Sequence, residues 1–127
     1  MIQPVIAIHG GAGAMSRAAM SPEKEQEYLS ALESILAAGQ AVLARGGSAL
    51  DAVTEAGRLL EDCPLFNAGH GAVFTSAGTH ELDAAIMDGA TLRSGAIANV
   101  NCVRNPVFAA RAVMAVSYTH LRAHETR

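Results

Sequence analysis

The stretch Val5-Ile6-Ala7-Ile8-His9-Gly10-Gly11-Ala12-Gly13 lies near the start of the chain and joins an apolar run to a glycine cluster. Four apolar residues bounded by glycines predict a short buried strand that ends in a loop. Glycine lacks the Cβ atom that bars positive φ angles, so another segment or a ligand can approach the backbone of such a loop. We therefore expect a strand inside a sheet, followed by a loop suited to chemistry.

Two helices are expected after this loop. Ser21-Pro22-Glu23 combines a hydroxyl cap, a proline at the first helical position and an acid near the positive end of the helix dipole. Apolar residues recur at helical spacing as far as Gly46-Gly47, which predicts a helix of about 23 residues. Ser48 and Asp51 form a variant capping box for a second helix, which Pro64 ends. The two helices should lie antiparallel in one layer.

The pattern then changes to strands, which are predicted at residues 72–75, 81–87 and 92–100. Asp88-Gly89 provides the turn between the last two strands. Asn105-Pro106 caps a third helix. This order of elements predicts an α/β (α+β) fold class with helices layered on a sheet.

The length of 127 residues suits one domain that buries roughly two-thirds of its unfolded surface. Residues 1–116 are expected to belong to that domain. The last eleven residues, 117–127, leave the Ala-rich pattern and bring two His and two Arg together. We expect this range to be an aberrant, non-native tail.

Composition also limits the partners and the compartment. The formal charge is −3, with no basic stripe, so neither nucleic acid nor a membrane is an expected partner. Cys63 and Cys102 form no Cys-x-x-Cys pair, which favours free, buried thiols in a reducing compartment. No apolar run approaches the roughly 20 residues of a membrane span, and no signal peptide is evident. We expect a cytoplasmic protein.

Four segments, read together, carry a resemblance to a known family. They are Ile8-His9-Gly10-Gly11-Ala12-Gly13, the range 60–74 with Pro64-Leu65-Phe66-Asn67-Ala68-Gly69 at its centre, Glu81-Leu82-Asp83-Ala84-Ala85-Ile86-Met87-Asp88-Gly89, and Arg104-Asn105-Pro106-Val107-Phe108-Ala109-Ala110-Arg111. In this order and at this spacing they resemble the N-terminal part of the plant-type L-asparaginase and isoaspartyl peptidase family. The resemblance covers about residues 1 to 116.

The resemblance implies an N-terminal-nucleophile hydrolase with an αββα four-layer sandwich. Such a precursor cuts itself into an α and a β subunit, which assemble as an (αβ)2 heterotetramer. The new N-terminal threonine attacks L-asparagine or a β-aspartyl dipeptide, with its own α-amine as base. No threonine of this sequence lies in the Gly-Thr-Val-Gly segment that the family uses for processing. The resemblance therefore implies an α half with an incomplete sandwich, which needs a β subunit and is inactive alone.

Site residues implied by the resemblance fall at matching positions only. His9, Gly10, Gly11 and Asn67 resemble a wall beside the missing nucleophile. A further set resembles a loop whose main-chain carbonyls ring a structural sodium ion: Leu60, Glu61, Cys63, Phe66, Ala68 and His70. Carbonyl oxygens suit a hard cation. No other cofactor is expected.

Alternatives remain for the same residues. The glycine loop and Asn67 are also compatible with ordinary turn chemistry. An oxyanion loop of the α/β-hydrolase type would need a Gly-x-Ser-x-Gly elbow, and a phosphate-binding module would need a Gly-Lys-Ser/Thr ending; the sequence has neither. A glycine-loop ligand-binding module and a non-catalytic fragment that needs a partner are the other hypotheses. Asp83 and Asp88 should lie on opposite faces of a strand, which argues against a catalytic pair.

Overall fold

A computed structural model describes residues 3–13 and 20–116 of the chain. Its elements are the helices α1 (Pro22–Ala44) and α2 (Ala49–Asp62), a short 3-10 turn η2 (Gly69–Gly71), the strands β1 (Leu82–Met87) and β2 (Ser94–Val100), and the helix α3 (Pro106–Ala115). This mixture of helix and strand agrees with the expected α+β class. The predicted tail at 117–127 lies outside the described residues.

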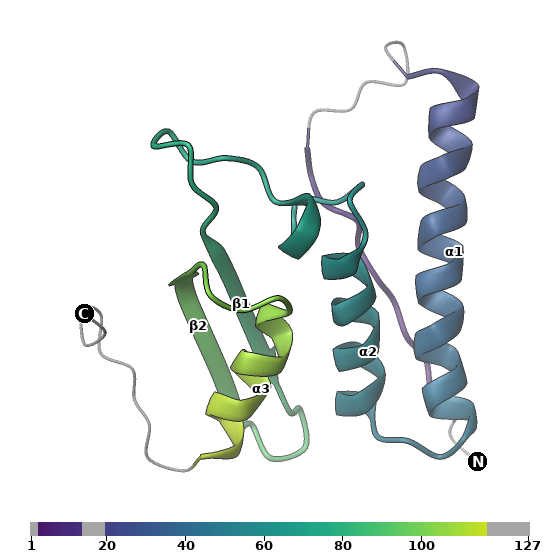
Figure 1. The fold of residues 1–127 in the computed structure, drawn as a ribbon. Coiled ribbons are helices and arrows are strands. Elements are labelled where there is room, and N and C mark those ends of the chain that lie inside the picture. The colour runs from purple at the N-terminus through teal and green to yellow at the C-terminus, as the bar shows by residue number, and fades with distance from the viewer. Residues whose placement is uncertain (1–2, 14–19, 117–127) are drawn as a thin grey trace.

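Helices α1 and α2 lie side by side, as Figure 1 shows. Each begins at the predicted cap: the Ser21 hydroxyl accepts a hydrogen bond from the Lys24 amide at 3.2 Å, and the Ser48 hydroxyl accepts one from the Asp51 amide at 3.0 Å. The Asp51 carboxylate completes the capping box by accepting from the Ser48 amide at 3.3 Å. Gly46 follows the end of α1 at a φ of 80°. The two helix predictions are confirmed.

The α1–α2 pair has its own apolar core. Buried Ile35, Ala56 and Phe66 form its centre, and Ile6 and Ile8 from the N-terminal segment pack against it. The N-terminal segment, purple in Figure 1, runs alongside the two helices. This segment therefore buries apolar side chains against helices and not inside a sheet.

The strand predicted at Val5–Ile8 is wrong, and so is the strand predicted at 72–75. Within the described residues the sheet consists of β1 and β2 alone. A strand needs a neighbour whose backbone N–H and C=O groups it can pair with. Neither segment has one there, and Val5, Val73 and Phe74 are among the most exposed large apolar residues.

The hairpin of β1 and β2 is antiparallel, with Ala85 opposite Ala96. The Asp88 turn forms as predicted, because the Asp88 carboxylate accepts from the Ala90 amide at 3.1 Å and from the Thr91 hydroxyl at 2.6 Å. The second strand begins two residues later than expected. Leu92 has a φ of 59° and donates its amide to the Asp88 carbonyl, so it still belongs to the turn.

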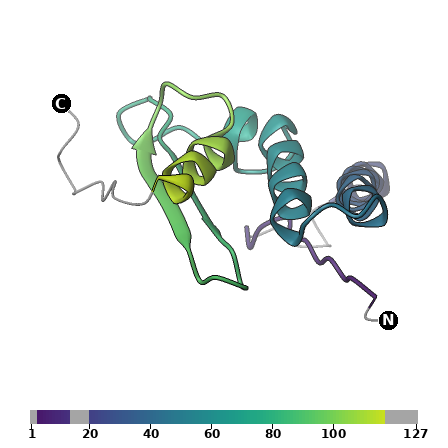
Figure 2. The same ribbon diagram turned by 90° about the horizontal axis from the view of Figure 1, so that it is seen from below.

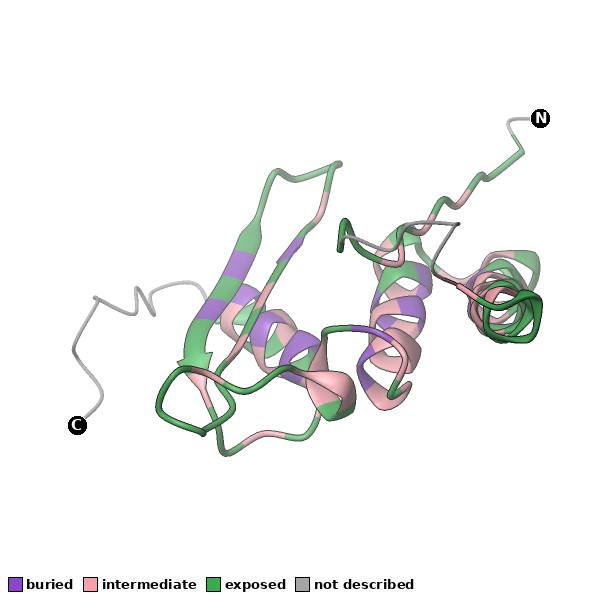
Figure 3. Cartoon of the chain, turned by 90° about the horizontal axis from the view of Figure 1, so that it is seen from above, coloured by how far each residue is buried: buried purple, intermediate pink, exposed green. Residues whose placement is uncertain are grey.

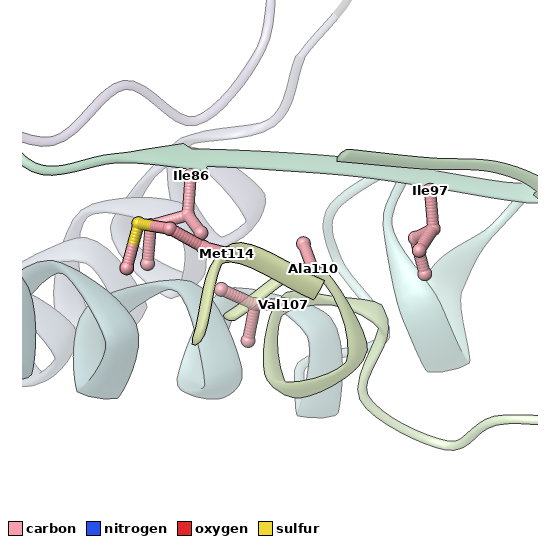
Figure 4. Packing of buried hydrophobic residues seen from close by; sticks show 5 residues of the cluster. All are labelled: Ile86, Ile97, Val107, Ala110 and Met114. Carbon is pink, nitrogen blue, oxygen red and sulfur yellow. The ribbon is translucent and has the colours of Figure 1, made fainter. Parts of the chain in front are cut away.

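Helix α3 covers one face of this hairpin and lies between it and α2 (Figure 2). A second core forms at the contact, where Ile86 and Ile97 meet Val107, Ala110 and Met114 (Figure 4). Buried and exposed positions alternate over the first part of β2, so its other face is open (Figure 3). The molecule thus has two small apolar cores with α2 and α3 at their junction.

Gly95 sets how closely α3 approaches the hairpin. A Cβ atom on Gly95 would overlap with the Ala110 carbonyl oxygen and the Met114 nitrogen of α3. We expect Gly95→Ala to destabilise the chain by about 1–3 kcal/mol, the usual cost of overpacking, as measured by thermal unfolding. Gly89→Ala is the matched control, because nothing lies within 4 Å of the new methyl group. Equal melting temperatures for the two variants would contradict this account.

Candidate functional site

The glycine loop at residues 9–13 is folded back on itself. The Gly11 amide donates to the Nδ1 atom of His9 at 3.0 Å. Gly11 has a φ of 113°, in the region that favours glycine over any residue with a Cβ atom. The loop prediction is therefore confirmed, and His9 has a local structural role within it.

Phe66 positions this loop against the helical core. A Cβ atom on Gly10 would lie 3.0 Å from the Phe66 ring and 3.3 Å from Leu32, so only glycine allows this approach without a shift. The Phe66 ring is 5% exposed and meets the Tyr28 ring edge to face, with the ring centres 5.9 Å apart. Close packing of the loop on a buried aromatic side chain fixes where its backbone runs.

This packing brings the predicted wall residues together. His9, Gly10, Gly11 and Asn67 all line one cavity of about 420 Å³. The side-chain oxygen of Asn67 accepts a hydrogen bond from the Val73 amide at 3.0 Å, which holds the turn that follows. The sequence segments around residues 10 and 67 are far apart in the chain, yet they form a single concave surface.

The carbonyls predicted to ring a cation lie where α2 ends and the chain curls back through η2. Several of these carbonyls already accept a backbone hydrogen bond: the Phe66 carbonyl accepts from the Ala68 amide at 2.8 Å and the Ala68 carbonyl from the Gly71 amide at 3.0 Å. A carbonyl oxygen has a second lone pair that remains for another group. Gly69, at a φ of 49°, would place a Cβ atom 2.5 Å from the Glu61 carbonyl oxygen. A Cβ atom on Gly71 would overlap with the Phe66 carbonyl oxygen. The two glycines therefore let the chain pass close to main-chain oxygens of this segment.

The remaining predictions concern two carboxylates, the two cysteines and the membrane. Asp83 accepts from the Asn99 amide at 2.7 Å, whereas Asp88 is used in the hairpin turn, so the two carboxylates do not pair. Cys63 and Cys102 are free, but Cys63 is only half-buried and Cys102 is exposed, so the expectation that both are buried is wrong. Among the described residues, no helix has the length and apolar character needed to cross a bilayer.

Comparison with known proteins decides the family. A sequence profile for the family described as asparaginase matches residues 2–124. The chain belongs to the asparaginase family.

Asparaginase-family relatives come from bacteria, archaea and eukaryotes. An isoaspartyl peptidase of Salmonella typhimurium is 64% identical over 114 residues, which cover 90% of this chain and 36% of that protein. The isoaspartyl peptidase of Escherichia coli has the same identity and coverage. A plant-type L-asparaginase of Pyrococcus abyssi is 47% identical over 109 residues, or 86% of this chain and 34% of the relative. The chain thus spans about a third of the length of these curated relatives.

In this asparaginase-family chain, the side chain of Glu61 has a role that was not predicted from the sequence, where only its carbonyl was assigned to the site. The carboxylate Oε1 atom accepts from the Val107 amide at 2.8 Å and so caps the start of α3. The Oε2 atom is buried and has no hydrogen-bond partner among the described residues. Glu61 and Asp62 in the last turn of α2 oppose the helix dipole, which is the one signal in the sequence of a special role.

Burial raises the pKa of the Glu61 carboxyl above its ordinary value of 4.5, although the Val107 hydrogen bond acts in the opposite direction. The folded chain then binds this proton more tightly than the unfolded chain, so the contribution to stability is complete below pH 4.5 and is lost as pH rises through the folded pKa. When the pH is raised from about 4 to 7, we expect the melting temperature of the Glu61→Gln variant to rise relative to that of the parent chain. The exposed Glu33→Gln variant is the control and should show no such pH-dependent gain. If the difference in melting temperature between Glu61→Gln and the parent chain did not change with pH, the raised pKa of Glu61 would be contradicted.

Proposed function

We propose that this chain forms the α half of a threonine-nucleophile hydrolase that acts on L-asparagine and β-aspartyl dipeptides. The observation that carries the proposal is the joint cavity of His9, Gly10, Gly11 and Asn67 in a chain of the asparaginase family. The named activities of the relatives, isoaspartyl peptidase and plant-type L-asparaginase, support the substrate class.

The chemistry would be divided between two halves. A threonine made by self-cleavage in the second half would attack the side-chain amide of L-asparagine, with its own α-amine accepting the proton. Loss of ammonia would leave an aspartyl ester, and water would then release aspartate and restore the threonine. The glycine loop and Asn67 would form one wall of that site, since their backbone positions are fixed by Phe66 and by the Val73 hydrogen bond.

The same proposal covers the assembly. The two halves would complete an αββα sandwich and associate as an (αβ)2 heterotetramer in the cytoplasm. The open face of the hairpin supports this, because it offers a sheet surface on which a second layer can pack. The chain by itself would lack the nucleophile and would not turn over substrate.

A structural sodium ion would be held by the main-chain carbonyls of Leu60, Glu61, Cys63, Phe66, Ala68 and His70. The close approach of the Glu61 carbonyl oxygen to Gly69 and of the Phe66 carbonyl oxygen to Gly71 supports this donor set, and oxygen donors alone suit a hard cation. The ion would fix the course of the segment that carries Asn67.

Aspartate release from L-asparagine tests the proposed reaction. The purified chain should release none, whereas the chain mixed with a separately produced second half should be active. In that complex Asn67→Ala should lower kcat by roughly tenfold or more through misplacement of the site wall. The control Asn101→Ala alters an exposed loop residue and should leave kcat unchanged. Turnover by the chain alone, or a folded complex without turnover, would refute the proposal.

Thermal unfolding in NaCl and in choline chloride of equal ionic strength tests the sodium site. Sodium at about a hundred times its dissociation constant adds roughly 2.7 kcal/mol, so the melting temperature should rise in NaCl alone. Gly69→Ala should abolish that rise because its methyl group displaces the Glu61 carbonyl. Gly78→Ala also strains a positive φ, of 75°, but has no neighbour within 4 Å, so it should retain the rise. If the parent chain had the same melting temperature in NaCl and in choline chloride, the sodium site would be excluded.

A further inference from the structure

The turn between β1 and β2 contains the one Asp-Gly step of the sequence, Asp88-Gly89, and the sequence has no Asn-Gly step. At an Asp-Gly step the glycine nitrogen can attack the aspartate side chain, because glycine has no Cβ atom to obstruct the approach. Gly89 is exposed, and nothing lies within 4 Å of the position that a Cβ atom would take. This peptide bond is therefore open to water and to a reaction of the chain with itself.

That reaction exchanges one peptide bond for another and leaves the mass of the chain unchanged. The Gly89 nitrogen forms a bond to the Cγ atom of Asp88, the Cγ–OH bond breaks, and the amide proton leaves with the hydroxyl as water, which gives a cyclic succinimide. A second water then gives its hydroxyl to the main-chain carbonyl carbon of Asp88 and its proton to the nitrogen, and the bond between that carbon and the nitrogen breaks. The product is isoaspartate, whose main chain runs through Cβ and Cγ and has one extra atom.

Two hydrogen bonds restrain the Asp88 carboxylate in the folded turn. It accepts from the Thr91 hydroxyl at 2.6 Å and from the Ala90 amide at 3.1 Å. The Thr91 hydroxyl, followed by the Ala90 amide, holds the pKa of the Asp88 carboxyl below its ordinary value of 3.8, so the group stays ionised. An ionised carboxylate has no hydroxyl that can leave, and a restrained one cannot turn freely toward the Gly89 nitrogen.

The main chain at Asp88 is also fixed. Its amide donates to the Arg93 carbonyl at 2.9 Å, and its carbonyl accepts from the Leu92 amide at 2.8 Å. Directly before it, Met87 pairs with Ser94 at the end of the hairpin. An extra main-chain atom at residue 88 disturbs these contacts, so isoaspartate there would open this end of the hairpin.

We propose that Asp88 is a site of spontaneous isomerisation to isoaspartate and that the Thr91 hydroxyl suppresses the reaction in the folded chain. Thr91 makes the shorter of the two hydrogen bonds to the carboxylate. It does so through a side chain, so a substitution removes this bond and leaves the main chain intact. The inference concerns the chain by itself and does not depend on the proposed function.

Incubation of the purified chain at neutral pH tests the proposal. Isoaspartate is quantified with an isoaspartyl methyltransferase and located by fragmentation in a mass spectrometer. Thr91→Val keeps the shape of the side chain but removes the hydroxyl, and it should form isoaspartate at residue 88 about tenfold faster than the parent chain, because a hydrogen bond to a charged group is lost.

Two control variants accompany Thr91→Val. Thr91→Ser keeps a hydroxyl and should be as slow as the parent chain. Thr79→Val is the matched control, because it removes another exposed hydroxyl, which is bonded to Thr75 at 2.9 Å in a different loop. It should leave the rate at residue 88 unchanged.

Incubation in concentrated urea separates the role of Thr91 from a folding defect. The parent chain should form isoaspartate at residue 88 faster in urea than when folded, and Thr91→Val should match it there, because the hydrogen bond no longer exists. Gly89→Ala should slow the reaction in urea, since its methyl group obstructs the attacking nitrogen. The proposal would be overturned by equal rates for the folded parent chain and folded Thr91→Val, by a faster Thr91→Val in urea, or by equal rates for the folded and unfolded parent chain.

Discussion

The hydrogen bond between the Glu61 carboxylate and the Val107 amide joins two packed units of the described chain. One unit is the α1–α2 pair with Phe66, and the other is the hairpin with α3. Near this bond, Asn105 donates to Asp62 at 3.1 Å, and Arg111 of α3 binds Thr54 of α2 at 3.0 Å. These polar contacts orient α3 on α2 together with apolar packing, since Leu50 and Gly57 of α2 lie against the cluster that contains Val107.

Local chemistry made the helices and turns predictable. Ser21, Ser48 and Asp51 act as caps within three residues of the groups they bind, and Asp88 organises its turn over a similar distance. The segments at 5–8 and 72–75 have the composition of strands but depend on a partner that the described chain does not supply. Composition alone cannot tell an apolar segment that pairs in a sheet from one that packs on helices, as Ile6 and Ile8 do.

The candidate site, too, could be predicted from the sequence only where its features are local. The conformation of the glycine loop follows from its sequence, since Gly11 needs a positive φ. That this loop lies beside Asn67 could be expected only from the family resemblance, because Phe66 and Gly10 meet across more than fifty positions of sequence. The buried Glu61 side chain was not foreseen, because its role depends on α3, which follows more than forty residues later. Two acids at the carboxyl end of α2 were the available clue.

The two-stranded hairpin has a consequence for how this chain behaves as a separate polypeptide. Within the described residues β1 and β2 pair only with each other, so each strand has one edge whose N–H and C=O groups point outward. Natural sheets protect such edges with lysines, prolines or bulges. A register shift between Leu82 and Ala84 interrupts this hairpin, but β2 reads Ser-Gly-Ala-Ile-Ala-Asn-Val and carries no charge. Free edges of this kind recruit further strands, including those of identical molecules. A chain whose strand edges stay uncovered is therefore open to fibrous self-association.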